Sequence, residues 1–86
     1  MREIKNRLKK CQPYFIEKDL FPKLYFNEER LEQEKWIFKY SFIRHLTDVS
    51  ISIRLGYTRQ NIHYIIKNIL RSNQAIIEEF LITQNI

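Results

Sequence analysis

TDVSISIRLGYTRQNIHYIIKNI, residues 47–69, places the only glycine of the chain between two segments that have helical spacing. Thr47 can cap a helix over residues 48–55, because a threonine oxygen accepts a hydrogen bond from an amide of the first helical turn. Gly56 follows that helix, and a glycine there adopts a positive φ without steric cost. We therefore expect one helix to end at a tight turn and a second helix to follow at once.

The second helix is predicted to begin after Thr58, which has the side chain of a capping residue. Its apolar residues recur at the spacing i, i+3, i+4 and i+7, which gathers them on one face of a helix. These residues are Ile62, Ile65, Ile66 and Ile69. A short helix, a glycine turn and a second amphipathic helix define a helix-turn-helix, so we expect this motif over residues 47–71.

The end of the first helix resembles that of the bacterial helix-turn-helix families, above all the last, promoter-reading region of sigma factors and similar regulators. Those families have Ile-Ala-x-x-Leu-Gly where this chain has Ile51-Ser52-Ile53-Arg54-Leu55-Gly56. They continue with an apolar turn residue, a Ser or Thr cap and a β-branched residue four places later. The matching residues here are Tyr57, Thr58 and Ile62, with Ile65 completing the core between the two helices.

Two residues depart from the family pattern. Ser52 replaces the alanine but is still small enough for close packing. Ile53 replaces a residue that is usually polar, so we expect another helix to cover that face of the first helix. The resemblance spans 23 of the 86 residues, and residues 1–46 resemble no family that we can name.

The resemblance implies that the second helix, about residues 59–70, lies in the major groove of double-stranded DNA. Arginine can pair with guanine through two hydrogen bonds, and glutamine or asparagine can pair with adenine in the same way. At about 100° per residue, the polar side chains fall opposite the isoleucine stripe. The residues expected to contact bases are Arg59, Gln60, Asn61 and His63. The residues expected to contact phosphates are Arg54, Thr58, Tyr64, Lys67 and Arg71.

These residues favour sequence-specific DNA binding by a small transcriptional regulator or mobile-element control protein. Residues 47–71 carry four basic residues and one acidic residue, a local charge of +3. The alternative is a helical protein–protein interaction module or an accessory subunit of a larger complex, since any surface helix has a polar face. Salt-sensitive DNA binding separates the two, because phosphate contacts release counterions. Frequent Ile, Lys and Asn are typical of AT-rich genes, such as those of low-GC bacteria, phages and plasmids.

The whole chain has 86 residues, a net charge of +5 and 44% hydrophobic residues. These values are typical of a single domain, and the basic excess suits a polyanionic partner. One cysteine excludes a disulfide framework, and one glycine excludes a phosphate-binding loop. No apolar run approaches the ~20 residues of a membrane span. We expect a cytoplasmic protein that is not an enzyme, with no cofactor, metal site, membrane association or small-molecule substrate.

Helices are also expected on both sides of the motif, which gives an all-α bundle of four to five helices without a β-hairpin wing. Residues 2–11 have an apolar stripe and end before Pro13, and residues 14–26 have the pattern of a short helix with an irregular connection. Residues 72–86 hold a C-terminal helix, which either continues the second motif helix or begins at a cap on Ser72. The residues of the first apolar stripe are Ile4, Leu8 and Cys11.

Asn27 is expected to cap a long helix over residues 28–46, with Phe26 and Leu31 packed together at its start. One apolar face of this helix holds Leu31, Phe38, Phe42 and Leu46, and the other holds Trp36, Tyr40 and Ile43. Its glutamates, Glu28, Glu29, Glu32 and Glu34, are expected to form a solvated face. Residues 1–46 thus support the motif and supply a possible dimer surface. The apolar residues in excess of one small core, which predict a homodimer, are Trp36, Tyr40, Ile43, Ile53, Ile77 and Leu81.

Overall fold

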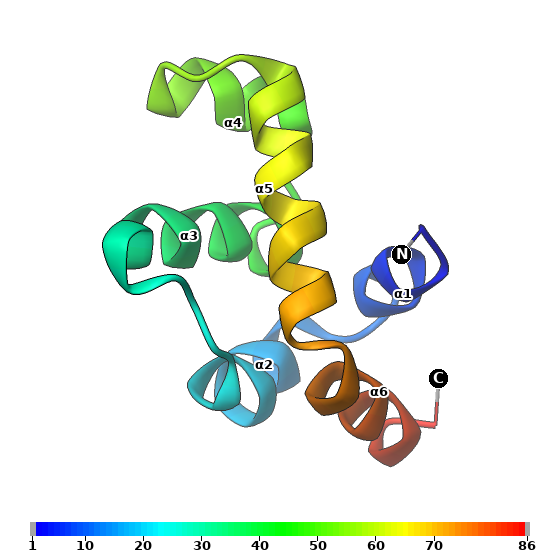
Figure 1. Cartoon of the computed structure of the whole chain (residues 1–86). Helices are drawn as coiled ribbons and strands as arrows, with labels where there is room; N and C mark the ends of the chain where they lie inside the picture. Colours follow the sequence, from blue (N-terminus) through cyan, green and yellow to red (C-terminus); the bar gives the residue numbers. More distant parts are fainter. Residues whose placement is uncertain (1, 86) are drawn as a thin grey trace.

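Helices make up every regular element of the computed structural model, which describes residues 2–85, and none of these residues forms a β-strand (Figure 1). The α-helices are α1 (Arg2–Lys9), α2 (Pro13–Phe15), α3 (Leu31–Phe38), α4 (Asp48–Leu55), α5 (Arg59–Ser72) and α6 (Gln74–Thr83). Short 3-10 and π-helical turns extend them: η1 (Ile16–Leu20), η2 (Phe21–Lys23), η3 (Glu28–Arg30) and η4 (Lys39–Ile43). The all-α prediction is confirmed, but these residues form six α-helices rather than four to five.

α5 lies in the middle of the fold, and the other elements are arranged around it (Figure 1). It packs against α3 near its middle, against α4 at its N-terminal half and against α6 at its C-terminal end (Figure 1). The apolar face of α5 supplies five side chains that are almost completely buried, as the i, i+3, i+4 spacing predicts. These side chains belong to Ile62, Ile65, Ile66, Ile69 and Leu70.

α1 covers α6 and reaches the side of α5 that lies opposite α3 (Figure 1). Its predicted apolar stripe is buried in the core, as expected for Ile4, Leu8 and Cys11. The Cys11 thiol donates a hydrogen bond of 3.6 Å to the backbone oxygen of Arg7. Burial raises the pKa of Cys11, while the nearby Arg7 guanidinium partly offsets this effect. Cys11 is therefore a core residue of the fold.

The segment after Asn27 begins as predicted, because the Asn27 side chain accepts a hydrogen bond of 2.9 Å from the amide of Glu29. Its apolar faces differ from the expectation. Leu31 is 37% exposed, and Ile37 is fully buried beside Phe38. Phe26 packs on Phe38, with ring centroids 6.3 Å apart. Leu31 is exposed because α3 begins only at that residue, after a 3-10 turn that changes the helical phase.

Glu34 also departs from the expected solvated face, since only 5% of its surface is exposed. Its Oε1 accepts a hydrogen bond of 3.0 Å from the Asn27 amide, and its Oε2 lies 3.8 Å from Nε of Arg30. A buried carboxylate needs such partners, because an unpaired charge is costly away from water. Glu34 thus holds the start of its own helix in place.

Asn73 separates α5 from α6, so the segment from residue 59 to residue 82 forms two helices and not one continuous helix. Its buried side chain accepts a hydrogen bond of 2.6 Å from the Tyr25 amide and donates one of 2.8 Å to the Tyr25 carbonyl. It also donates a hydrogen bond of 2.9 Å to the carbonyl of Ile69. The chain therefore bends at Asn73, and the helix boundary lies one residue after the predicted cap at Ser72.

The bend turns α6 back onto the core, where Ile77 and Leu81 are completely buried. These two residues were expected in a dimer surface, and that expectation is wrong because α1 and η1 of the same chain cover α6. Tyr40 and Ile43, from the same expected surface, are half-buried against the core. No helix within residues 2–85 combines the length and the apolar character needed to cross a membrane.

Asn73→Ala is expected to lower the free energy of unfolding by about 1–3 kcal/mol, because it leaves the amide and carbonyl of Tyr25 without their partners. Urea denaturation followed by circular dichroism measures this change. Asn61→Ala is the control, since Asn61 is exposed and its side chain holds no other element. The control should change stability by less than about 0.5 kcal/mol. Equal effects of the two substitutions would contradict the role of Asn73.

Candidate nucleic-acid interface

The turn between α4 and α5 is built by three short-range features that the sequence predicts. Thr47 Oγ1 accepts a hydrogen bond of 3.1 Å from the Ser50 amide at the start of α4. Gly56 has a φ of 74°, and its amide donates to the Ser52 carbonyl at 2.9 Å. Thr58 Oγ1 then accepts a hydrogen bond of 3.0 Å from the Asn61 amide at the start of α5. The chain therefore leaves one helix and enters the next within three residues.

The inner faces of α4 and α5 meet through the predicted core positions. Ile51, Ile62 and Ile65 are buried, while Leu55 and Tyr57 are partly buried against the same cluster. Ser52, in the position of the family alanine, is also buried, and its hydroxyl donates a hydrogen bond of 2.7 Å to the Val49 carbonyl. Its polar group is thus satisfied within α4, so the small side chain fits the helix contact.

The outer face of α5 is solvent-exposed at every residue proposed for base or phosphate contact. No hydrogen bond or ion pair to the rest of residues 2–85 engages the side chains of Gln60, Tyr64, Lys67 or Arg71. Arg59 and Asn61 are exposed beside this row, at the first turn of α5. A face of this kind presents hydrogen-bond donors and positive charge without first having to break contacts inside the protein.

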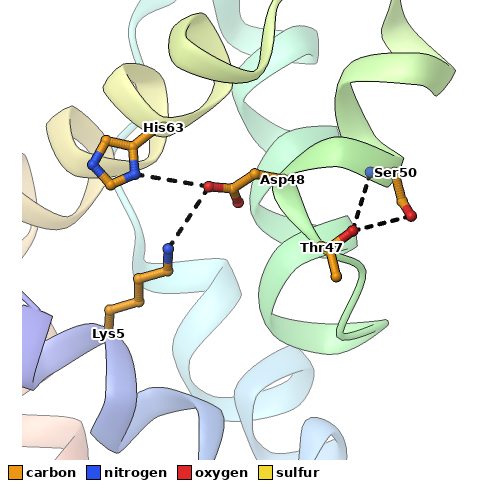
Figure 2. Close-up of polar contacts among 5 residues, drawn as sticks. All are labelled: Lys5, Thr47, Asp48, Ser50 and His63. Atoms are coloured by element: carbon orange, nitrogen blue, oxygen red, sulfur yellow. Dashed lines mark hydrogen bonds and ion pairs between the residues drawn. The ribbon is translucent and has the colours of Figure 1, made fainter.

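His63 lies at one edge of that face and points toward the start of α4 (Figure 2). Its Nδ1 is 3.7 Å from Oδ2 of Asp48, and Nζ of Lys5 lies 4.0 Å from the same oxygen. Asp48 therefore links three helices, since Lys5 belongs to α1 and His63 to α5. The His63 side chain is still 65% exposed, so this contact leaves most of the imidazole accessible.

Arg54 lies apart from the other proposed phosphate contacts, over the ring of Tyr40 in η4. Its guanidinium carbon is 5.7 Å from the ring centroid, and that of Arg44 is 5.6 Å from the same ring. Trp36 stacks on Tyr40 with a centroid distance of 5.5 Å. The aromatic–arginine cluster, Trp36, Tyr40, Arg44 and Arg54, thus lies beside α4 on the α3 side of the molecule.

Ile53 is 77% exposed, so the expectation that another helix of the chain covers this face of α4 is wrong. The physical reason is the path of the chain: α5 and η4 pack on the side of α4 that holds the buried Ile51 and Ser52. Val49, one turn earlier, is also exposed. An apolar edge of α4 is therefore available for contact with another molecule.

A groove of about 580 Å³ separates α1 from α5, and its position could not be derived from sequence spacing. The residues that line it are Arg2, Lys5, Asn6, Lys9, His63, Ile66, Lys67 and Leu70. The sequence shows that α1 is basic and amphipathic, but only the fold brings this helix beside the proposed DNA-binding face. The groove therefore adds cations that the motif alone does not reveal.

Within the part of the chain that the structure describes, no three His, Cys, Asp or Glu residues lie close enough to hold a metal ion together. Comparisons with protein-family models, curated proteins and solved structures gave no match for this chain.

Gly56→Ala is expected to cost about 1–2 kcal/mol of folding free energy, because an L side chain is strained at a φ of 74°. The strain is purely conformational, since a Cβ at this position would meet no atom within 4 Å. Gly56→Asn should cost less, because asparagine adopts the left-handed region more readily. Urea denaturation of both variants measures the difference. Equal losses for alanine and asparagine would contradict this cause.

Proposed function

We propose that this protein binds double-stranded DNA in a sequence-specific manner, as a small transcriptional regulator or a mobile-element control protein. In this proposal α4 and α5 act as a helix-turn-helix without a wing, and α5 lies in the major groove. The observation that carries the proposal is the outer face of α5, which is polar, exposed and free of acidic residues. Such a face offers amide and guanidinium groups to base edges and cations to phosphates.

The two kinds of contact divide along α5. Arg59, Gln60 and Asn61 lie at its N-terminal turn, where the side chains of a recognition helix approach base edges. Lys67 and Arg71 lie two and three turns later and suit phosphates, as does the hydroxyl of Tyr64. His63 reaches a base only from the α1 edge of this face, since its imidazole is turned toward Asp48.

We also propose a homodimer, in which two copies of α5 would read half-sites about 34 Å apart. With Ile77 and Leu81 inside the core, the remaining candidates for its interface are Trp36 and Ile53, which are 42% and 77% exposed. The Tyr40 ring stacks on Trp36, and Arg54, the residue after Ile53, lies over the same ring. Exposed large apolar side chains of this kind are typical of association surfaces.

The second candidate function is that of an accessory subunit that binds an acidic partner protein through this same surface. Arg44 and Arg54 flank Tyr40, and Lys39 lies 5.2 Å from the Trp36 ring centroid. These cations repel one another across a symmetric interface and attract an acidic surface instead. The oligomeric state in solution therefore discriminates between the homodimer and the accessory subunit.

Fluorescence anisotropy with duplex DNA at two salt concentrations tests the main proposal. We expect the affinity to fall steeply as salt rises, because each phosphate contact releases counterions. Gln60→Ala should reduce the preference for a selected sequence over a scrambled one, at a cost of about 1–3 kcal/mol for the selected sequence. Lys67→Ala should weaken binding to both sequences equally.

Lys23→Ala is the charge-matched control for Lys67→Ala, because Lys23 is exposed in η2, beside Asp19 and α6 and away from α5. This control should bind DNA with nearly the affinity of the unchanged protein. Weak binding that is independent of salt would refute DNA binding as the function. An equal loss in the Lys23 and Lys67 variants would show that only net charge matters.

Sedimentation velocity tests the homodimer, for which we expect a mass of about twice the 10.7 kDa of one chain at micromolar concentration. Ile53→Glu should shift the protein to the monomer, since it replaces an apolar contact at the interface with a charge that costs free energy to remove from water. Ile82→Glu is the matched control, because Ile82 is an equally exposed isoleucine on α6. A monomer in the unchanged protein rules out the homodimer and favours the accessory subunit.

A further inference from the structure

The groove between α1 and α5 is lined by basic residues from both helices. α1 contributes Arg2, Lys5 and Lys9, while α5 contributes Lys67 and the imidazole of His63. Ile66 and Leu70 form the apolar part of the lining, and no acidic residue is part of it. Cations that converge on one concave surface from two separate helices create a positive potential that a single helix would not produce.

The nearest acidic group does not cancel this potential. Asp48 lies beside the groove, where its carboxylate contacts Nζ of Lys5 at 4.0 Å and Nδ1 of His63 at 3.7 Å. Both distances are long for an ion pair, so a stronger anion can attract Lys5 without a large loss. Arg2, Lys9 and Lys67 have no ion-pair partner among the residues that the structure describes.

The opposite flank of α5 does not carry a comparable cluster of basic residues. There Asn68, Ile69 and Ser72 line a smaller depression of about 220 Å³ together with Arg30 and the carboxylate of Glu34. The two flanks of the proposed DNA-binding helix therefore differ in charge. Because a helix in the major groove has a phosphate backbone on each side, this asymmetry selects the α1 flank for the closer backbone contact.

The spacing of the α1 cations suits a strand of phosphates. Arg2, Lys5 and Lys9 follow the spacing i, i+3 and i+7, so they lie on one face of the helix. Seven residues span about 10 Å of helix axis. Each strand of duplex DNA carries one charge per ~3.4 Å of the duplex axis, so the length of this row matches about three successive phosphates.

We propose that a backbone strand of bound duplex DNA lies in the groove between α1 and α5, with Arg2, Lys5 and Lys9 as phosphate contacts opposite Lys67. This inference rests on the proposed function, because the strand belongs to the duplex whose major groove α5 enters. The α1 cations add affinity without sequence preference, since phosphates are the same at every base pair. α1 is thereby a DNA-contacting element as well as part of the core.

Lys9 and Lys10 provide a matched pair for the test. Lys9 is the last residue of α1 and Lys10 follows it with the same charge, but only Lys9 lines the groove. We expect Lys9→Gln to reduce the slope of log affinity against log salt by about 0.9, the value for one phosphate contact in duplex DNA. Lys10→Gln should leave the slope within error of the unchanged protein. The ratio of affinities for selected and scrambled duplexes should stay constant in both variants.

The outcomes separate this inference from the function on which it rests. If the unchanged protein binds DNA with a steep salt dependence but Lys9→Gln and Lys10→Gln have equal slopes, the groove contact is refuted and DNA binding stands. If the unchanged protein shows no salt-dependent binding, both proposals fail. Thermal unfolding of each variant checks that α1 remains folded, and equal melting temperatures assign the slope difference to DNA contact.

A small phosphate compound could bind the same cations in place of the DNA backbone. Pyrophosphate at millimolar concentration tests it through the melting temperature, because a ligand that binds only the folded state stabilises it. We expect no rise that depends on Lys9. A rise that Lys9→Gln abolishes, together with unchanged DNA binding by that variant, would overturn the proposal and identify the groove as a site for a small anion.

Discussion

The fold depends on one constraint: α5 has a single apolar stripe, and four helices pack around it. α4 packs on the first half of α5 through Ile62 and Ile65, and α3 crosses α5 near its middle (Figure 1). α6 and α1 enclose the second half, near Ile69 and Leu70. Because an 86-residue chain buries only about 60–65% of its unfolded surface, no side of this stripe can be left open. The polar side of α5 is therefore kept outside by packing, whatever it binds.

The bend at Asn73 keeps acidic residues off the outer face of α5, in addition to directing α6 onto the core. In an uninterrupted helix, Glu78 would follow Arg71 by seven residues and would extend the row of Gln60, Tyr64 and Lys67 with a negative charge. The hydrogen bonds between Asn73 and Tyr25 end α5 before that point and direct α6 onto the core. The bend thus shortens α5 to 14 residues and leaves its outer face free of acids.

Local features were predictable from the sequence, and long-range ones were not. The caps at Thr47 and Thr58 and the turn at Gly56 depend on residues at most three or four apart, so spacing alone reveals them. The Asn73 contact joins residues 48 positions apart, and no helical period encodes it. The same limit explains the exposure of Ile53 and the burial of Ile77 and Leu81, which depend on where α1, η1 and η4 pack. The groove beside α5 is likewise a product of the tertiary fold.

The two surfaces proposed for binding lie on opposite sides of α5 and do not compete. α1 and the basic groove are on one side, and α3 with the aromatic–arginine cluster is on the other (Figure 1). A single small DNA-binding module buries only about 600–1,000 Å² of protein surface, which limits its affinity. In the proposed complex, phosphate contacts from α1 and a second subunit on the α3 side would be two independent ways to raise it. If α5 binds DNA as proposed, a chain of this size would combine one recognition helix with two separate surfaces that raise its affinity.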